Sequence, residues 1–294
     1  MIIKDKFSKL TNISKLTGCI AFFTNEKSEI SHLKKYLGSS EHKNLNVLLK
    51  NKSKKKGLLS FDLNPNQKII LISLKKNQKP NEIEKSGAKL TDFLNIDGAG
   101  SAHIISDTIT VNSKSDAIYE FLHGMRLKSY SFDRYKSKKD SNTLKLNIVS
   151  SKKFNKKIYD KYKAIELGVN YTKDLVSEPG NILHPDEYAK RLTQLKKIGL
   201  KVSVYNEKQL KKMGCNALVG VGQGSIRGSY LVTLEWRGKK SNSKPLAFVG
   251  KGVCFDTGGI SLKPARFMED MTYDMAGSAV VVGLMKNLAL RKSK

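Results

Sequence analysis

The sequence predicts an α/β protein with a small N-terminal α/β domain, a linker helix, and an incomplete C-terminal α/β domain that has a mainly parallel sheet. The chain has 294 residues, enough for two domains of about 100–200 residues each. Short apolar or β-branched runs alternate with helical stretches in both halves. A long amphipathic stretch separates the halves, so we place the domains at residues 1–150 and 179–294, with the linker at 151–178.

The first domain contains apolar runs of strand length. They predict strands at residues 19–23, 68–74, 102–105 and 144–149. Lys79 and Pro80 come just before acidic residue 82, which predicts a helix that begins there, and residues 115–124 predict a second helix. The Lys-, Asn- and Ser-rich stretches 39–57 and 136–143 are predicted loops.

From Asn155 the pattern becomes that of a long amphipathic helix. Its apolar positions recur every three or four residues until Glu178-Pro179-Gly180 ends it. A helix is then predicted from His184 to residue 199, and an apolar helix over residues 275–290 closes the chain. Between these two helices, helical segments alternate with predicted strands at 200–205, 230–236 and 246–249, which is the pattern of a parallel sheet.

Composition argues against several classes of protein. The net charge is +28, but only 7 of the 54 basic residues are arginine, the side chain that phosphate and base recognition favours. A lysine-rich composition therefore explains the charge better than dedicated nucleic-acid binding, and any such binding is expected to be weak. The apolar runs are shorter than the ~20 residues of a membrane span. The N-terminus has no signal-peptide pattern and the cysteines are few and scattered, so we expect a cytoplasmic protein.

One segment carries most of the functional signal. Residues 249–263 read VGKGVCFDTGGISLK. Glycines on both sides of Lys251 allow a bend at the carboxyl end of the predicted strand, where ligands bind in open α/β sheets. Asp256 and Lys263 follow in the same segment, and Asp274 stands at the start of the last helix. We expect these four side chains around one cleft, because two carboxylates suit a hard metal ion and an ammonium can serve as an electrophile.

This segment resembles the signature of the leucyl aminopeptidases of the M17 peptidase family, VGKG-x-x-FD-[ST]-GG-x-x-[IL]-K. Further segments fit the same family: DMAG at 274–277, DLVSEPGN at 174–181, GVGQGS at 220–225 and SFDRYK at 131–136. The resemblance implies that Lys251, Asp256 and Asp274 are metal ligands and that Asp256 bridges two ions. It also implies that Lys263 polarises the carbonyl of the substrate.

The resemblance further implies a metal-dependent aminopeptidase that releases N-terminal amino acids from peptides, leucine preferred, by a two-metal hydrolytic mechanism. Two divalent ions, Mn or Zn, and a homohexamer are implied as well. The family's second motif, NTDAEGR, supplies two more carboxylates and an arginine, and no such segment occurs in these 294 residues. We therefore expect a truncated form, in which Asp256 and Asp274 balance only two of four metal charges. The alternative is a catalytically inactive family member that binds nucleic acid or acts as a scaffold.

Taken singly, some of these features have simpler explanations. Asp274 alone is typical of a helix N-cap. The glycine-rich residues 220–224 lack the GK[ST] ending of a phosphate loop and predict a turn. The five histidines form no HExxH pattern, and Cys254 is predicted to pack in the interior rather than act as a nucleophile. Only the complete signature favours the catalytic interpretation.

Overall fold

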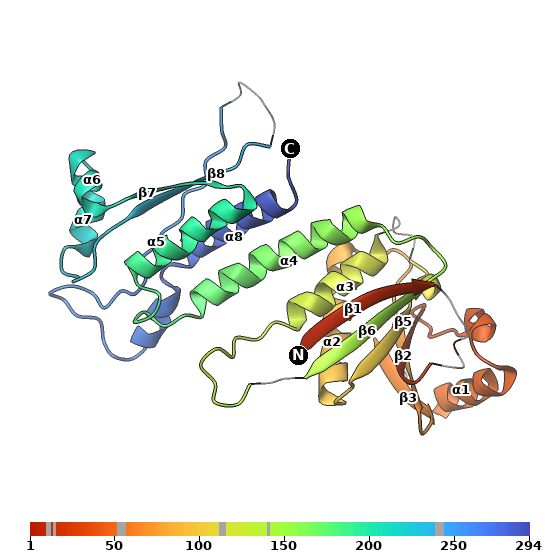
Figure 1. The fold of residues 1–294 in the computed structure, drawn as a ribbon. Coiled ribbons are helices and arrows are strands. Elements are labelled where there is room, and N and C mark those ends of the chain that lie inside the picture. The colour runs from red at the N-terminus through yellow and green to blue at the C-terminus, as the bar shows by residue number, and fades with distance from the viewer. Residues whose placement is uncertain (10–12, 14–15, 52–56, 112–115, 140–141, 239–243) are drawn as a thin grey trace. The chain divides into compact units, whose positions relative to one another are not determined.

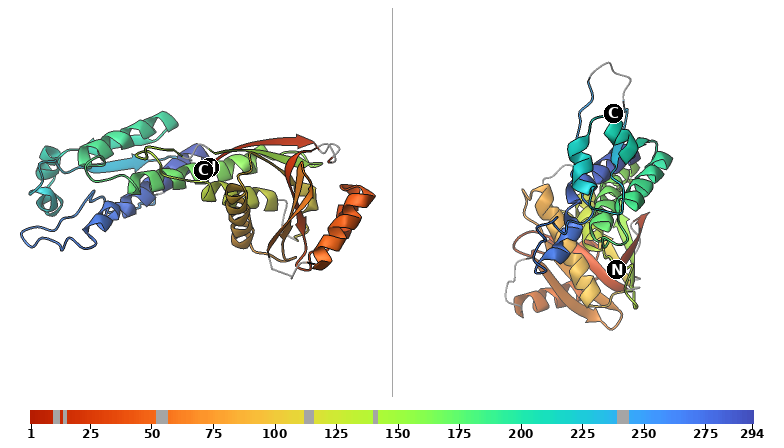
Figure 2. Two further views of the ribbon diagram at one scale, coloured as in Figure 1. Left: turned by 90° about the horizontal axis from the view of Figure 1, so that it is seen from below. Right: turned by 90° about the vertical axis from the view of Figure 1, so that its left-hand side faces the viewer.

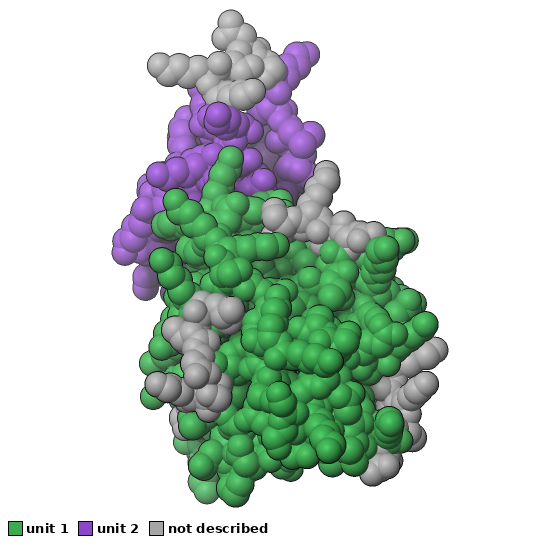
Figure 3. Space-filling view, turned by 90° about the vertical axis from the view of Figure 1, so that its right-hand side faces the viewer, with its two compact units in different colours: residues 1–162 green, residues 163–294 purple. Residues whose placement is uncertain are grey.

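The computed structural model describes residues 1–294 except 10–12, 14–15, 52–56, 112–115, 140–141 and 239–243 (Figure 1). The chain divides into two compact units, Met1–Tyr162 and Lys163–Lys294, which are coloured separately in Figure 3. The boundary falls inside one long helix, α4 (Lys156–Val176). The α/β class predicted from the sequence is confirmed. No helix in the described part of the chain is long and apolar enough to cross a membrane.

Unit 1 is built on a mainly parallel six-stranded sheet with the order β1-β6-β5-β2-β4-β3. Its strands are β1 (Ile2–Lys9), β2 (Gly18–Thr24), β3 (Leu58–Asn64), β4 (Gln67–Ser73), β5 (Ser101–Ile105) and β6 (Thr143–Ser150). Only β3 pairs antiparallel, with β4. The four predicted strands correspond to β2, β4, β5 and β6, and they are apolar because both faces of the sheet are covered.

Helices cover both faces of this sheet, α1 on one side and α2 with α3 on the other, as Figure 2 shows. They are α1 (Ser39–Asn51), α2 (Pro80–Ile96) and α3 (Ala117–Lys128), with short 3-10 turns η2 (Ser31–Lys35) and η3 (Ser106–Thr108). Strand alternation sends Phe22 into the α1 side of the core and Phe23 into the α2/α3 side. The loop predicted over residues 39–57 is wrong for residues 39–51, which form α1, and its residues 52–56 lie outside the described part of the chain. Leu45 is fully buried and anchors this helix, although the helix is mostly polar.

Helices α2 and α3 touch backbone to backbone. A Cβ atom at Gly87 would lie 2.0 Å from the carbonyl oxygen of Phe121, and one at Gly124 would lie 1.9 Å from that of Glu84. Real side chains do not tolerate such distances, so both positions need glycine for this packing. The crossing of the two helices is therefore specified by two residues that are 37 positions apart in the sequence.

Unit 2 consists of helices around a small two-stranded sheet. Its elements are the end of α4, then α5 (Pro185–Thr193), η4 (Gln194–Ile198), β7 (Lys201–Tyr205), α6 (Glu207–Lys212), α7 (Asn216–Gly222), β8 (Leu231–Glu235), η5 (Met268–Tyr273) and α8 (Ala276–Leu290). Helices α4 and α8 pack closely, because a Cβ at Gly168 would lie 2.5 Å from the Gly283 carbonyl oxygen. The Thr172 hydroxyl also donates to the carbonyl of Ala279 at 3.0 Å.

Two expectations for the second domain are wrong. Strands β7 and β8 pair antiparallel, with Tyr205 opposite Leu231, whereas the sequence predicted a parallel sheet there. Helices α6 and α7 do not cross a face of the sheet. They lie beyond one end of β7, and the chain then runs back as β8 alongside β7 (Figure 1). The predicted strand at 246–249 is not formed either, since no described strand offers it a backbone partner.

Candidate active site

The glycines of the signature segment allow it to lie against the start of α8. A Cβ atom at Gly250 would lie 2.5 Å from the Cα of Ser278, so the backbone approaches the helix closely only with glycine there. The amide of Ser278 donates to the Lys251 carbonyl at 2.9 Å. Lys251 is thus fixed to the first turn of α8. It does not lie at the carboxyl end of a strand, as the sequence predicted.

Lys251 and Asp274 form the first ion pair of the site. The Lys251 Nζ lies 2.6 Å from Asp274 Oδ1, the lysine side chain being 58% exposed and the aspartate 18%. Asp274 ends η5 and precedes α8, whose N-cap is Met275, so the simpler N-cap explanation for Asp274 is wrong. Its second oxygen, Oδ2, is buried and accepts no hydrogen bond from any described residue.

Asp256 and Lys263 form the second ion pair, at 3.1 Å between Oδ2 and Nζ. The loop between them closes on itself: the amide of Lys263 donates to the Thr257 carbonyl at 2.9 Å, and Gly258 adopts a left-handed φ of +92°. The Gly258 amide donates to Asp256 Oδ1 at 2.9 Å. That amide, together with the Lys263 ammonium, lowers the pKa of Asp256, so the carboxylate form is favoured.

The two ion pairs are electrostatically linked, because the charge of Lys251 also contributes to the lowered pKa of Asp256. The structure therefore pairs the four residues that the sequence singled out two by two, Lys251 with Asp274 and Lys263 with Asp256. No cluster of three or more His, Cys, Asp or Glu side chains that could hold a metal occurs among the residues the structure describes. With both lysines protonated, the two carboxylates and two ammonium groups together carry no net charge.

The donors at this site fit a divalent cation in one specific respect. A buried carboxylate oxygen without a partner is unfavourable unless a proton or a cation compensates it. Asp274 Oδ2 is in that situation, while a cationic ammonium already lies against its Oδ1. Carboxylate oxygens are also the ligands that hard divalent ions prefer. The residues present therefore fit a bound metal ion at Asp274, beside Lys251.

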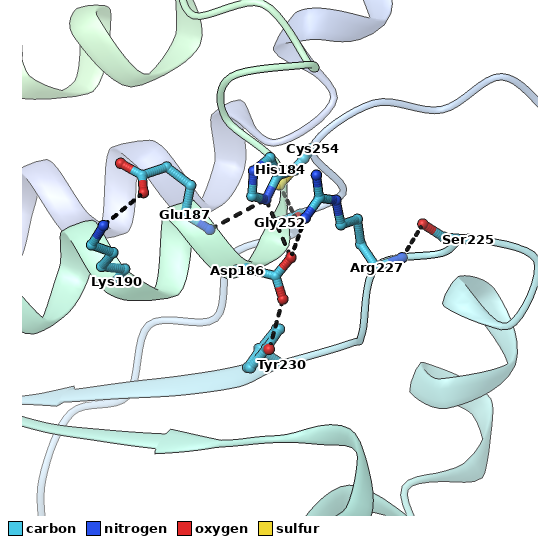
Figure 4. A network of polar contacts seen from close by, with 9 residues as sticks. All are labelled: His184, Asp186, Glu187, Lys190, Ser225, Arg227, Tyr230, Gly252 and Cys254. Atoms are coloured by element: carbon cyan, nitrogen blue, oxygen red, sulfur yellow. Dashed lines mark hydrogen bonds and ion pairs between the residues drawn. The ribbon is translucent and has the colours of Figure 1, made fainter.

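A polar network at the start of α5 was not predicted (Figure 4). Asp186 accepts a hydrogen bond from the Tyr230 hydroxyl at 2.7 Å and lies 3.5 Å from Arg227 and 3.3 Å from His184 Nδ1. The amide of Glu187 donates to the same His184 nitrogen at 3.4 Å, so the imidazole caps the helix. Asp186 and Tyr230 are 44 positions apart, and no local pattern indicates their contact.

Cys254 lies beside this network and is buried. Burial, with a smaller effect of the Asp186 charge, raises the pKa of its thiol to about 12. The nucleophilic form of cysteine is the thiolate. A packing role is therefore favoured over a catalytic one, in agreement with the expectation from the sequence.

The segment 174–181 packs against the signature segment and against α5. Glu178 is fully buried and accepts a hydrogen bond from Arg191 of α5 at 2.7 Å. Two residues later, a Cβ at Gly180 would lie 2.9 Å from the Cβ of Phe255, which is the neighbour of Asp256. The turn that ends α4 therefore packs directly against the signature segment and requires glycine where it does so.

Comparison with known proteins identifies relatives across both units. A family model described as the N-terminal domain of the cytosol aminopeptidase family matches residues 22–139, and one described as the catalytic domain of that family matches residues 170–294. A probable cytosol aminopeptidase of Phytoplasma australiense is 47% identical over 205 residues, which are 69% of this chain and 42% of that protein. A protein of the same description from Rhizobium rhizogenes is 41% identical over 256 residues, 81% of this chain and 51% of that protein.

Solved structures share the fold. The bottromycin maturation enzyme BotP in complex with Mn superposes with a TM-score of 0.70 at 20% identity, covering 93% of this chain and 56% of that one. A variant of tomato leucine aminopeptidase gives a TM-score of 0.70 at 20% identity, covering 98% and 60%. The chain thus spans about half the length of the curated relatives and solved structures that it matches.

Proposed function

Because the chain belongs to the cytosol aminopeptidase family, we propose that it provides the N-terminal domain and the first part of the catalytic site of a metal-dependent aminopeptidase. The substrates would be peptides, from which N-terminal amino acids, leucine preferred, are released by two-metal hydrolysis. The observation that carries the proposal is the pairing of Lys251 with Asp274 and of Lys263 with Asp256, together with one buried Asp274 oxygen that no described residue satisfies.

The proposed ligands are Asp256, Asp274 and Lys251, and the ions are Mn or Zn. When bound, divalent ions supply Lewis-acid polarisation of the peptide carbonyl and a water of lowered pKa. Lys251 must lose its ammonium proton to ligate, and this requires it to give up the ion pair with Asp274. Asp256 is held as a carboxylate by the Gly258 amide and by Lys263, so it is ready to bind a cation without releasing a proton.

Lys263 has the opposite task. Its ammonium must remain charged to stabilise the negative oxygen that develops on the substrate carbonyl during hydrolysis. In the structure that ammonium lies 3.1 Å from the Asp256 carboxylate and 3.5 Å from the Met271 sulfur. It is therefore oriented by an ion pair and by a weak hydrogen bond to a thioether. Binding of a cation at Asp256 would weaken the ion pair and leave the ammonium available to the substrate.

The catalytic proposal is tested in a fusion of this chain to the part of the Phytoplasma australiense relative that follows its matched region. We expect hydrolysis of leucine p-nitroanilide that depends on added Mn or Zn. Lys263→Ala should lower kcat by about 10²–10³-fold, the usual effect of removing one group that stabilises a developing oxyanion.

The matched control is Lys244→Ala, an exposed lysine 19 positions upstream of Lys263 that makes none of the site's ion pairs. Its kcat should equal that of the unmodified fusion. Full activity in Lys263→Ala, or in Asp274→Asn, would contradict the assignment of the site. Negligible turnover by the 294-residue chain alone is expected, because two carboxylates cannot hold two dications tightly.

A further inference from the structure

Strand β1 forms one edge of the sheet of unit 1 (Figure 1). It pairs with β6 alone, in parallel, and the amide of Ile2 donates to the Asn142 carbonyl at 2.8 Å. In a parallel pair the amide and the carbonyl of one residue point to the same neighbour, and successive residues alternate between the two sides of the strand. Ile3, Asp5 and Phe7 therefore direct their backbone groups away from the sheet. No described residue forms a hydrogen bond with the backbone of these three residues.

One face of β1 is covered by the core of unit 1. Successive side chains of a strand alternate between its faces, and those of Ile3 and Phe7 pack against the core beneath α2 and α3. Between them, the Asp5 carboxylate lies 2.7 Å from Arg126 Nη1 and accepts a hydrogen bond from the Tyr159 hydroxyl at 3.1 Å. The negative charge on this face is thus compensated within the protein, and its other side chains are apolar.

The opposite face of β1 is basic. Lys4 and Lys6 are exposed, and the exposed Lys145 of β6 lies directly beside Lys4 in the register of the two strands. Burial and, to a smaller extent, the charge of Lys6 lower the pKa of His103 on β5. No described carboxylate forms an ion pair with any of the three lysines. We call Lys4, Lys6 and Lys145 the basic sheet face. Like charges side by side are unfavourable, so an anionic partner would stabilise this arrangement.

The backbone and the side chains of β1 together specify what could bind there. An extended segment that pairs with the backbone of Ile3, Asp5 and Phe7 would bring every second side chain to the basic sheet face. Carboxylates suit those positions, and apolar side chains suit the alternate positions beside Ile3 and Phe7. We propose that β1 binds an acidic extended segment of a partner protein, in which Glu or Asp alternates with apolar residues, as an added strand of the sheet. The candidate catalytic residues all belong to unit 2, so this proposal is independent of the proposed function.

Two other occupants fit β1 less well. A second copy paired edge to edge would bring lysines against lysines, and each copy carries a net charge of +28. Single-stranded nucleic acid binds sheets through aromatic side chains on which its bases stack. The side chains of β1 and β6 on the basic side of the sheet include no aromatic ring; they are Ile2, Lys4, Lys6, Ser8, Thr143, Lys145, Asn147 and Val149.

A synthetic peptide tests the proposal. The peptide has the length of β1, eight residues, in which Val and Glu alternate, and an N-terminal fluorescein removes the free amine that an aminopeptidase needs. In fluorescence anisotropy with the 294-residue chain at low salt, we expect saturable binding with a Kd below about 1 mM. The amides of Ile3, Asp5 and Phe7 should gain protection against hydrogen exchange. Those of Lys4 and Lys6 should not change, because they already bond to β6.

Variants of the chain separate the basic sheet face from general attraction to a basic protein. Lys4→Glu and Lys6→Glu should each weaken binding by about tenfold or more, while the circular dichroism of the free chain stays unchanged. The matched control is Lys89→Glu, an exposed lysine on α2 whose substitution changes the net charge equally. It should bind the peptide as tightly as the unmodified chain.

Two further peptides test the added strand. One has the same residues with all Val before all Glu, and the other is N-methylated at alternate amides, so that it keeps every charge but cannot donate to β1. Both should bind about tenfold more weakly or worse. Undiminished binding of either peptide, no binding of the alternating peptide, or an equal loss in Lys89→Glu would overturn the proposal. Tighter binding of oligothymidylate than of the peptide, lost in Lys4→Glu, or a homodimer that protects the same amides would overturn it as well.

Discussion

Glu178→Ala should destabilise unit 2 far more than Glu187→Ala, although both carboxylates bind the same guanidinium. Arg191 lies 2.7 Å from Glu178 and 2.9 Å from Glu187. The Glu178 side chain is completely buried, whereas that of Glu187 is 28% exposed. Removing one partner of a buried ion pair costs about 3–5 kcal/mol, because the other charge stays behind in a poorly solvated place. Solvent-screened pairs contribute only about 0.2–1 kcal/mol.

The magnitude can be converted into a melting temperature. Arg191 retains Glu187 in the Glu178→Ala variant, so the loss should be near the lower limit, about 3 kcal/mol. Unit 2 has roughly 130 residues, and an unfolding entropy of ~2.1 cal/mol/K per residue gives ~0.27 kcal/mol/K. The expected drop in Tm is therefore about 11 °C for Glu178→Ala and about 2 °C for Glu187→Ala.

Fluorescence provides a local assay, since Trp236 is the only tryptophan of the chain and packs, partly buried, against the core of unit 2. Its indole nitrogen donates to the Ser293 carbonyl at 2.8 Å, so its emission should change when that unit unfolds. Thermal scans of the two variants at one pH and salt concentration give the comparison. Equal shifts in Tm for the two variants, or a shift below about 3 °C for Glu178→Ala, would refute the argument from burial.

Three further predictions concern pH, thiol chemistry and nucleic acid. The folded-state pKa of Asp256 lies below its ordinary value. The contribution of this carboxylate to stability is therefore complete above about pH 4 and is lost as the pH falls through the folded pKa. In urea unfolding followed by fluorescence, Asp256→Asn should be less stable than the unmodified chain at pH 7 and equally stable in strong acid. A stability difference that persists at pH 2 would contradict this. Iodoacetamide at pH 8 should modify the half-buried Cys215 well before Cys254, whose thiol pKa is about 12, and mass spectrometry of labelled peptides would detect the reverse order. DNA binding, measured by fluorescence anisotropy, should be insensitive to sequence and fall steeply with salt; nanomolar, sequence-selective binding at physiological salt would argue for a dedicated nucleic-acid site.

The sequence by itself determined the features that depend on near neighbours along the chain. The three- and four-residue spacing that predicts α4, the buried runs of β2, β4, β5 and β6, and the composition of residues 249–263 are all local. Strands β1 and β3 were missed, because they are the edge strands of the sheet and their mixed polar composition carries little apolar signal. The site residues were found for the same local reason: three of the four lie within one segment of 15 residues, 249–263.

Only the tertiary structure decided which distant groups meet. It places Tyr230 and Arg227 on Asp186, buries Glu178 against Arg191, and pairs β7 with β8 antiparallel where alternating elements predicted a parallel sheet. It also leaves residues 246–249 without a strand partner among the described residues, although their apolar composition predicts a buried strand. The physical reason is common to all of these cases. A backbone amide or a buried charge is satisfied by whichever partner the fold brings within hydrogen-bonding distance, and spacing along the chain does not specify that partner.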